Sequence, residues 1–237
     1  MLKPFEHVFP LVAGDKQGEV TVVAGTVFSI GGDRFMTAGH CVVTAFEREW
    51  QAIGIARDQE WNFFDVTSAE YDDDYDVAFF QADLPAYGTL KWATEDVHMG
   101  ESLCSVGYAH AFDPDRKALG IRTFMGYVVG SKEFHRLRST PGIYELSFQC
   151  PRGLSGAPVF TPTADPRITG VVIGNASMEM EVYSSREVSE KDDKVETYTR
   201  FEALQLGVAL RKTSVLDVKS PKILGGTLGE HLAKHGL

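Results

Sequence analysis

Short apolar runs of strand length recur along most of this 237-residue chain, and turn residues close each of them. Some runs are continuous and others alternate apolar with polar side chains, the pattern of strands that bury one face. Such spacing predicts a mostly antiparallel, all-β protein. The expected strands cover residues 20–28, 34–36, 77–80, 123–129, 143–148, 157–160 and 170–173.

Composition excludes several classes of partner. Apolar residues make up 43% of the chain, but no stretch of 18 consecutive apolar residues occurs, so a transmembrane helix is excluded. The formal charge is −10, with no block of Lys and Arg. This argues against nucleic acid and against an anionic membrane as partners.

Cysteine usage and the first residues bear on the compartment. Cys41, Cys104 and Cys150 are widely spaced and form no CxxC pair, so they allow at most one disulfide and predict no zinc site. Buried, reduced thiols are expected, as in a cytoplasmic protein. Residues 1–8 lack the apolar core and cleavage site of a secretory signal, which indicates a cytosolic chain or one already trimmed.

Three short motifs carry candidate chemistry. Thr37-Ala38-Gly39-His40-Cys41 delivers a histidine at a strand end, and Asp74-Tyr75-Asp76-Val77 places a carboxylate directly before an apolar strand. In Gly153-Leu154-Ser155-Gly156-Ala157, glycine on both sides of the serine allows a sharp turn whose N–H groups point one way. A nucleophilic serine needs such an exposed hydroxyl with converging backbone donors. An α/β-hydrolase elbow is not expected, because no βα alternation surrounds the motif.

Together, these motifs resemble those of the chymotrypsin-like (trypsin-like) serine proteases, and in the same order, His, Asp, Ser. The resemblance covers roughly residues 20–212. It implies two six-stranded antiparallel β-barrels with the active site in the cleft between them, followed by a short C-terminal helix. His40 and Asp76 would come from the first barrel and Ser155 from the second. No metal or cofactor is implied.

The resemblance also assigns roles. Ser155 would attack the scissile carbonyl, His40 would accept its proton, and Asp76 would orient the imidazole. The backbone N–H groups of Gly153 and Ser155 would form the oxyanion hole. A substrate pocket would involve Gln149, Cys150, Ile173, Gly174 and Asn175, with Glu196 at its back selecting Lys or Arg, unless Glu196 faces water.

Departures from the family pattern bear on compartment and control. Cys41 has no cysteine partner near Gly25, which supports a reducing compartment. Leu154 replaces the acid that pairs with a new N-terminal amine in zymogen-type members, and their Ile/Val-Val-Gly-Gly cleavage sequence is absent. Activation by that switch is therefore excluded, and narrow specificity or gating by a protein partner is expected.

The expected organisation is a protease domain over residues 1–212, with a first barrel at about 15–85 and a second at about 100–200. Residues 81–100 would cross between them. Residues 179–194, being highly charged, predict a solvated loop, and 200–212 suit an amphipathic helix although the pattern also tolerates a strand. The tail, 213–237, receives no role.

Three functions remain open at this point. The first is a cytoplasmic serine endopeptidase acting on proteins or peptides through an acyl-enzyme. The second is a catalytically silent pseudoprotease that binds peptides in the same cleft. The third is an esterase or a self-processing protease cut at Arg186 or Lys191.

Overall fold

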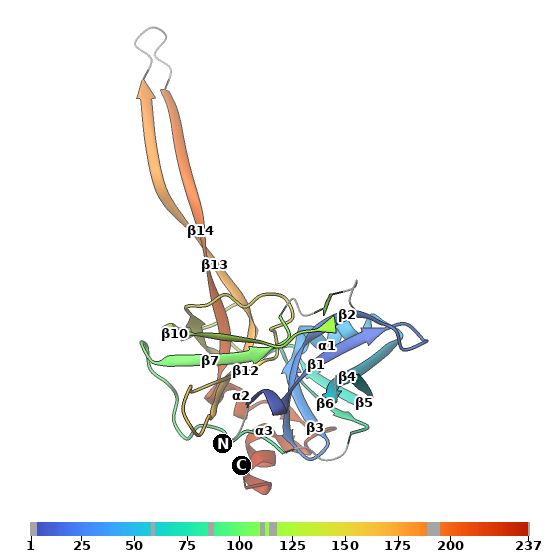
Figure 1. The fold of residues 1–237 in the computed structure, drawn as a ribbon. Coiled ribbons are helices and arrows are strands. Elements are labelled where there is room, and N and C mark those ends of the chain that lie inside the picture. Colours follow the sequence, from blue (N-terminus) through green and yellow to red (C-terminus); the bar gives the residue numbers. More distant parts are fainter. Residues whose placement is uncertain are drawn as a thin grey trace.

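The computed structural model describes residues 4–57, 60–84, 88–109, 112–113, 118–188 and 195–236. All seven expected strands are present, and further strands complete two closed six-stranded barrels (Figure 1). The first barrel follows a one-turn 3₁₀ helix, Pro4–His7. It consists of β1 (Val8–Gly14), β2 (Val20–Gly31), β3 (Arg34–Ala38), β4 (Trp50–Arg57), β5 (Glu60–Asp72) and β6 (Val77–Ala82).

The second barrel repeats the strand order of the first. In each barrel the first three strands are neighbours in sequence order, and the sixth, fifth and fourth close the ring. The second barrel consists of β7 (Ser102–Gly107), β10 (Arg122–Glu133), β11 (Gly142–Leu146), β12 (Pro158–Phe160), β13 (Ile168–Val188) and β14 (Val195–Arg211). A small hairpin, β8 (Phe112–Asp113) and β9 (Ala118–Leu119), lies between β7 and β10 in the sequence. The two-barrel fold expected from the sequence is thereby confirmed.

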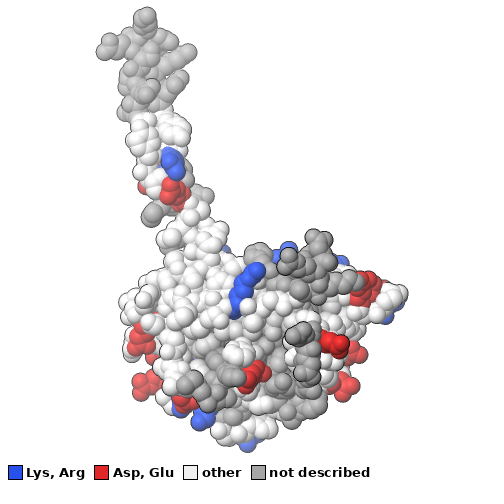
Figure 2. All heavy atoms as spheres, in the orientation of Figure 1, with Lys and Arg blue, Asp and Glu red and all other residues white. Residues whose placement is uncertain are grey.

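The crossing between the barrels runs from the end of β6 to the start of β7, as the turn residues of 81–100 indicate. None of the helices in the described part of the chain has the length and apolar character needed to span a membrane. Figure 2 shows charged side chains scattered over the visible face of the body rather than gathered in one patch.

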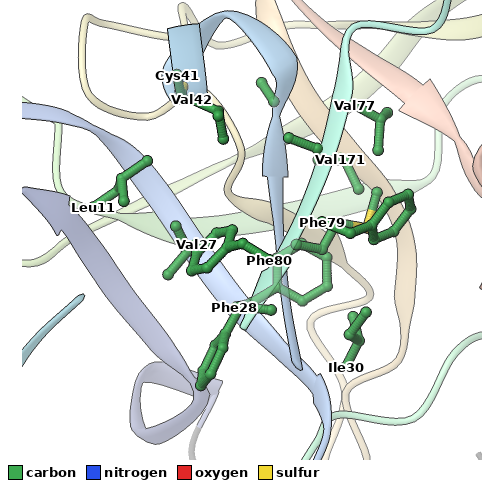
Figure 3. Packing of buried hydrophobic residues seen from close by; sticks show 14 of the residues in the cluster. Leu11, Val27, Phe28, Ile30, Cys41, Val42, Val77, Phe79, Phe80 and Val171 are labelled. Atoms are coloured by element: carbon green, nitrogen blue, oxygen red, sulfur yellow. The ribbon is translucent and has the colours of Figure 1, made fainter. Parts of the chain in front are cut away.

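The largest cluster of buried apolar side chains draws on both barrels, and the second barrel has a further cluster of its own. Phe28, Phe79 and Phe80 fill the first barrel, and Val171 from β13 joins the same cluster (Figure 3). Fully burying side chains of this size contributes about 1.5–3 kcal/mol each. The barrels are thus packed against each other through apolar contacts.

Two expectations about the last third of the chain are wrong. Residues 200–211 are not a helix but the inner part of β14, where Leu204, Leu206, Val208 and Leu210 recur with period two. Residues 179–188 are not a loop but the outer part of β13. β13 and β14 pair from Gly170 opposite Arg211 to Val188 opposite Val195, and they leave the barrel as a long two-stranded ribbon (Figure 1). Lys191, a candidate self-cleavage site, lies outside the described residues.

The C-terminal segment returns to the first barrel. It comprises α2 (Lys212–Leu216), β15 (Lys219–Ser220), β16 (Gly226–Thr227) and α3 (Leu228–Lys234). The short C-terminal helix is therefore present, but it starts after residue 211. Buried Leu228 and Leu232 join the large core, and the imidazole Nε2 of buried His231 lies 3.1 Å from the Ile30 carbonyl of β2. The tail, which the sequence left without a role, thus contributes to the packing of the first barrel through its described residues, 213–236.

Candidate active site

A carboxylate–imidazole pair lies at the edge of the first barrel. His40 stands in the first turn of α1 (Gly39–Phe46), directly after β3, and Asp76 directly precedes β6. His40 Nδ1 lies 2.8 Å from Asp76 Oδ2, and the His40 backbone N–H donates to Oδ1 at 2.8 Å. Because an ionised carboxylate can only accept, Nδ1 carries the proton, and Nε2 is left as the basic nitrogen.

The backbone of Asp76 is held in an uncommon conformation to make this pair. Its φ is 53°, in the left-handed region that Asp and Asn enter more readily than most residues. The Gly39 N–H donates to the Asp76 carbonyl at 2.9 Å. A Cβ on Gly39 would lie 3.0 Å from Asp76 Oδ1, so a glycine lets the helix start approach the carboxylate closely.

The surroundings of His40 favour its cationic form. Burial of the ring lowers its pKa, but the hydrogen bond to Asp76, together with contributions from Cys41, outweighs this and raises the pKa to about 10. The side chain keeps 46% of its surface exposed, so the ring also meets solvent. The pair therefore stabilises a positive charge on the imidazole.

Ser155 lies in a loop built from two successive tight turns. Leu154 N–H donates to Pro151 carbonyl, and Ala157 N–H donates to Leu154 carbonyl, both at 3.0 Å. Gly153 and Gly156, each the third residue of its turn, have φ of 93° and 84°. Positive φ at that position is typical of type II turns and favours glycine. This explains the two glycines that flank the serine.

The serine loop is anchored on the first barrel. Buried Thr26 of β2 donates from Oγ1 to the Gly153 carbonyl at 2.7 Å, and its backbone N–H donates to the Ser155 carbonyl at 2.8 Å. The Thr37 hydroxyl donates in turn to the Thr26 carbonyl at 2.7 Å. A Cβ on Gly156 would lie 2.1 Å from Thr37 Oγ1, so the loop touches the barrel directly.

The serine loop also contacts the segment that carries the predicted histidine. Cys41, which follows His40, places its Sγ 3.6 Å from the Ser155 carbonyl. Gly156 packs against the backbone of Ala38, two residues before His40. Residues 153–156 and 37–41, far apart in the sequence, therefore lie in contact where the barrels meet.

The backbone of the serine loop offers two hydrogen-bond donors. Within the described residues, the N–H groups of Gly153 and Ser155 donate to no partner, whereas those of Leu154, Gly156 and Ala157 are all bonded. Two unpaired donors at alternate positions of a tight loop suit a developing oxyanion.

The segment expected to line a pocket is hydrogen-bonded to β13 and β14 where the ribbon leaves the barrel. The Asn175 side chain accepts from the Cys150 N–H and donates to the Cys150 carbonyl, both at 2.7 Å. The Gly207 N–H donates to the Phe148 carbonyl at 2.9 Å. Gln149, between these anchors, is exposed, while Ile173 is nearly buried and Gly174 half-buried. The exposed Asn175 therefore joins the backbone of Cys150 to β13.

Glu196 does not belong to this region. In the register of β13 and β14, Asn175 lies opposite Gly207, whereas Glu196 lies opposite Glu187 near the outer end of the ribbon. At about 3.3 Å per residue, the separation along β14 is roughly 35 Å. The expectation of a carboxylate at the back of the pocket is wrong, because the ribbon carries that position away from the barrel.

Sequence reasoning missed the threonines that hold the serine loop. Thr26 and Thr37 are completely buried in otherwise apolar strands. A hydroxyl buried in a barrel must be hydrogen-bonded, so a threonine within an apolar strand indicates a specific hydrogen-bond partner. Their partners could not be read from the sequence, since Thr26 and Gly153 stand 127 residues apart.

The three thiols are free and buried, as expected. Burial raises the pKa of Cys104 to about 11 and that of Cys150 to about 12. Both side chains are therefore neutral thiols at physiological pH and are poor nucleophiles.

Comparisons with known proteins agree with this geometry. Residues 25–174 match the trypsin-like peptidase domain. None of the curated proteins matches the chain.

Solved structures share the fold at low sequence identity. The active form of the Rv3671c protease from M. tuberculosis superposes with a TM-score of 0.61 at 18% identity, covering 93% of this chain and 82% of that one. The MamO protease domain from Magnetospirillum magneticum gives 0.59 at 12% identity, covering 87% and 92%. The HtrA-type protease AlgW, crystallised with a decapeptide, gives 0.61 at 12% identity, covering 97% and 65%.

Proposed function

Because the chain belongs to the trypsin-like peptidase family, we propose that it is an endopeptidase that cuts polypeptides through an acyl-enzyme on Ser155. The observation that carries this proposal is the His40–Asp76 pair at 2.8 Å, beside a serine loop with two unpaired N–H groups. A histidine so oriented supplies the base that a serine hydroxyl needs.

The reaction follows from the arrangement. Ser155 Oγ attacks the scissile carbonyl carbon while His40 Nε2 takes the hydroxyl proton, and the carbonyl oxygen becomes an oxyanion. When the C–N bond breaks, the imidazolium returns the proton to the leaving amine, and the acyl group stays on Oγ. Water then attacks the ester by the same route. Asp76 holds the imidazole orientation and stabilises its cation throughout.

The N–H groups of Gly153 and Ser155 would stabilise the oxyanion. Each such donor is worth about 3–4 kcal/mol of barrier in serine proteases. Their direction depends on the two turns, and these depend on the hydrogen bonds from Thr26.

We further propose that Asn175 restricts the side chain before the scissile bond to small residues. Its amide bonds both backbone groups of Cys150. On this proposal, the bridge stands where a long side chain would enter. Asn175→Gly is expected to shift the preference in a peptide library toward larger side chains by about tenfold, since opening a pocket changes discrimination by 1–3 kcal/mol. Exposed Ser131→Ala, on β10, serves as the control, with an unchanged preference.

The family position and the site together favour a protein or peptide substrate. The buried, free thiols support a reducing compartment such as the cytoplasm. Control by a protein partner or by narrow specificity stays a proposal. The pocket restriction by Asn175 supports narrow specificity.

Covalent labelling with a fluorophosphonate tests the proposed chemistry. We expect labelling of the unmodified chain and of Ser131→Ala, an exposed serine on β10, and none of Ser155→Ala or His40→Ala. Labelling that persists in Ser155→Ala would contradict the assignment of the nucleophile. A folded chain without labelling that still binds peptides would instead be a pseudoprotease.

A further inference from the structure

β13 leaves the second barrel beside Ser155 and continues outward with one edge open. At the barrel, the Val172 N–H donates to the Ala157 carbonyl at 2.9 Å, and its carbonyl accepts from Gly156 at 2.8 Å. β12 pairs with β13 only as far as Val171. Beyond Val172, no strand in the described part of the chain pairs with this edge, while β14 covers the opposite edge as far as Val188.

The register shows which backbone groups face the open edge. The Gly207 N–H points away from β13, because it donates to Phe148. Asn175, opposite Gly207, therefore turns its backbone groups away from β14. Every second residue of a strand presents its N–H and C=O to the same edge, so Ser177 also offers both groups to the open edge.

Several large apolar and aromatic side chains of the ribbon are exposed to solvent. Val182, Tyr183, Tyr198 and Leu204 are each more than two-fifths exposed, and the two tyrosine rings pack at 6.1 Å. Figure 2 shows uncharged side chains where the ribbon leaves the body and charged ones farther out. On β14, Arg200 pairs with Glu202. A two-stranded hairpin is marginally stable in water, and a third strand would stabilise it.

We propose that the open edge of β13 over residues 175–188 binds an extended segment of a polypeptide substrate as an added antiparallel strand. This site rests on the proposed function and extends it outside the cleft. The edge is continuous with the hydrogen bonds that Val172 already makes to the serine loop. Pairing through backbone groups gives affinity for an extended chain of almost any sequence.

The direction of β13 fixes which part of the substrate lies on the ribbon. β13 runs outward, so an antiparallel strand runs inward and ends at Ser155. The bound segment is therefore on the N-terminal side of the scissile bond and spans up to about 45 Å, at ~3.3 Å per residue. The substrates are unfolded or extended polypeptides, with apolar side chains at positions that meet the exposed tyrosines.

Peptides of graded length test this site. The probes carry a sequence that the chain cuts in an unfolded protein, extended on its N-terminal side by about 4, 8 or 12 alternating Val and Thr residues. Matched probes carry the same extensions on the C-terminal side. We expect kcat/KM to rise with N-terminal length and to be insensitive to C-terminal length.

Two proline variants separate the two edges of the ribbon. Ser177→Pro removes an N–H from the open edge of β13, and Gln205→Pro removes one from the outer edge of β14, directly opposite. Neither proline interrupts the β13–β14 ladder, since both sites turn their N–H away from the partner strand. We expect Ser177→Pro to reduce the advantage of the longest peptide over the unextended one at least about fivefold, and Gln205→Pro to preserve it.

Affinity gives a second readout that does not need turnover. Fluorescence anisotropy on the Ser155→Ala chain measures binding of a fluorescein-labelled Val-Thr peptide of about 12 residues, with and without Ser177→Pro. Selective weakening by Ser177→Pro supports the site. Equal effects of the two prolines, or no dependence on N-terminal length while fluorophosphonate labelling succeeds, would overturn it and leave the proposed function standing. A chain that binds the peptide at this edge but is never labelled would retain the site and lose the protease function.

Discussion

The two barrels share one strand order but hold their functional residues by different means. In the first barrel, the His40–Asp76 pair is fixed by hydrogen bonds between two neighbouring strand ends. In the second barrel, the Ser155 loop takes its key hydrogen bonds from Thr26 of the first barrel. The base is thus built locally, whereas the nucleophile is positioned across the interface between barrels.

This difference indicates which substitutions should impair the nucleophile and which should impair the base. A defect in the first barrel near Thr26 should disturb the serine and the oxyanion donors without touching the His–Asp pair. A defect near Asp76 should disturb only the base. Substitutions on either side can therefore separate the two halves of the site.

The largest effect is expected at the His40–Asp76 pair, the part of the site that is built within the first barrel. Asp76→Asn should lower kcat for peptide hydrolysis by about 10⁴-fold, because the imidazole loses its orienting carboxylate. Steady-state kinetics on a peptide substrate measures this. Asp74→Asn, two residues earlier in the same turn, is the control and should retain activity. Near-normal kcat in Asp76→Asn would refute its assignment as the orienting carboxylate.

The second effect is a pH dependence of kcat/KM that arises from the same His40–Asp76 pair. The pKa of His40 is raised to about 10, so the neutral imidazole that accepts the serine proton forms only as the pH rises. Between pH 7 and 10, kcat/KM should increase by up to about 10³-fold. The sign for stability is opposite: the favourable charge on His40 is complete below pH 6.5 and is lost as the pH rises toward 10. A pH–rate profile that reaches its plateau below pH 7.5 would contradict this prediction.

The third effect concerns the Ser155 loop, which Thr26 holds from the other barrel. Thr26→Val keeps the shape but removes the hydroxyl that donates to Gly153 and accepts from the Tyr108 N–H. Labelling of Ser155 should slow by roughly 10²-fold, as when an oxyanion donor is lost, and unfolding free energy should fall by about 1–3 kcal/mol.

Thr169→Val is the matched control for Thr26→Val. Thr169 is equally buried, and its hydroxyl donates to Val159, away from the serine loop. It should lose stability while the folded protein keeps its labelling rate. Equal slowing in both variants would show that the anchoring by Thr26 has no special effect.

The smallest effect concerns the segment that returns to the first barrel. Burial lowers the pKa of His231, and the nearby cations of Arg34 and Lys234 act in the same direction, although the hydrogen bond to the Ile30 carbonyl opposes them. The unfolded chain then binds the extra proton more readily, so stability should fall by about 1 kcal/mol or less as the pH drops below 6.5. Urea unfolding at pH 7.5 and 5.5 measures this, and His231→Gln should reduce the difference.

Sequence reasoning was most successful where function depends on local motifs. The strands around His40, Asp76 and Ser155 were predicted because apolar alternation and glycine turns are local signals. The ribbon was missed because an exposed hairpin needs no buried face, so its charged residues look like a loop. The assignment of Glu196 failed for the same reason. The ribbon lengthens both strands, so the residue of β14 that lies opposite Asn175 is Gly207 and not one near Glu196.

The placement of the chain ends has a practical consequence. The blue start of the described chain and the red helix α3 both lie on the side of the molecule away from the ribbon (Figure 1). A bead or a fused domain attached at either end would therefore hold the protein by its base. The ribbon would then point into solution, where a long polypeptide could approach it from any side without meeting the support.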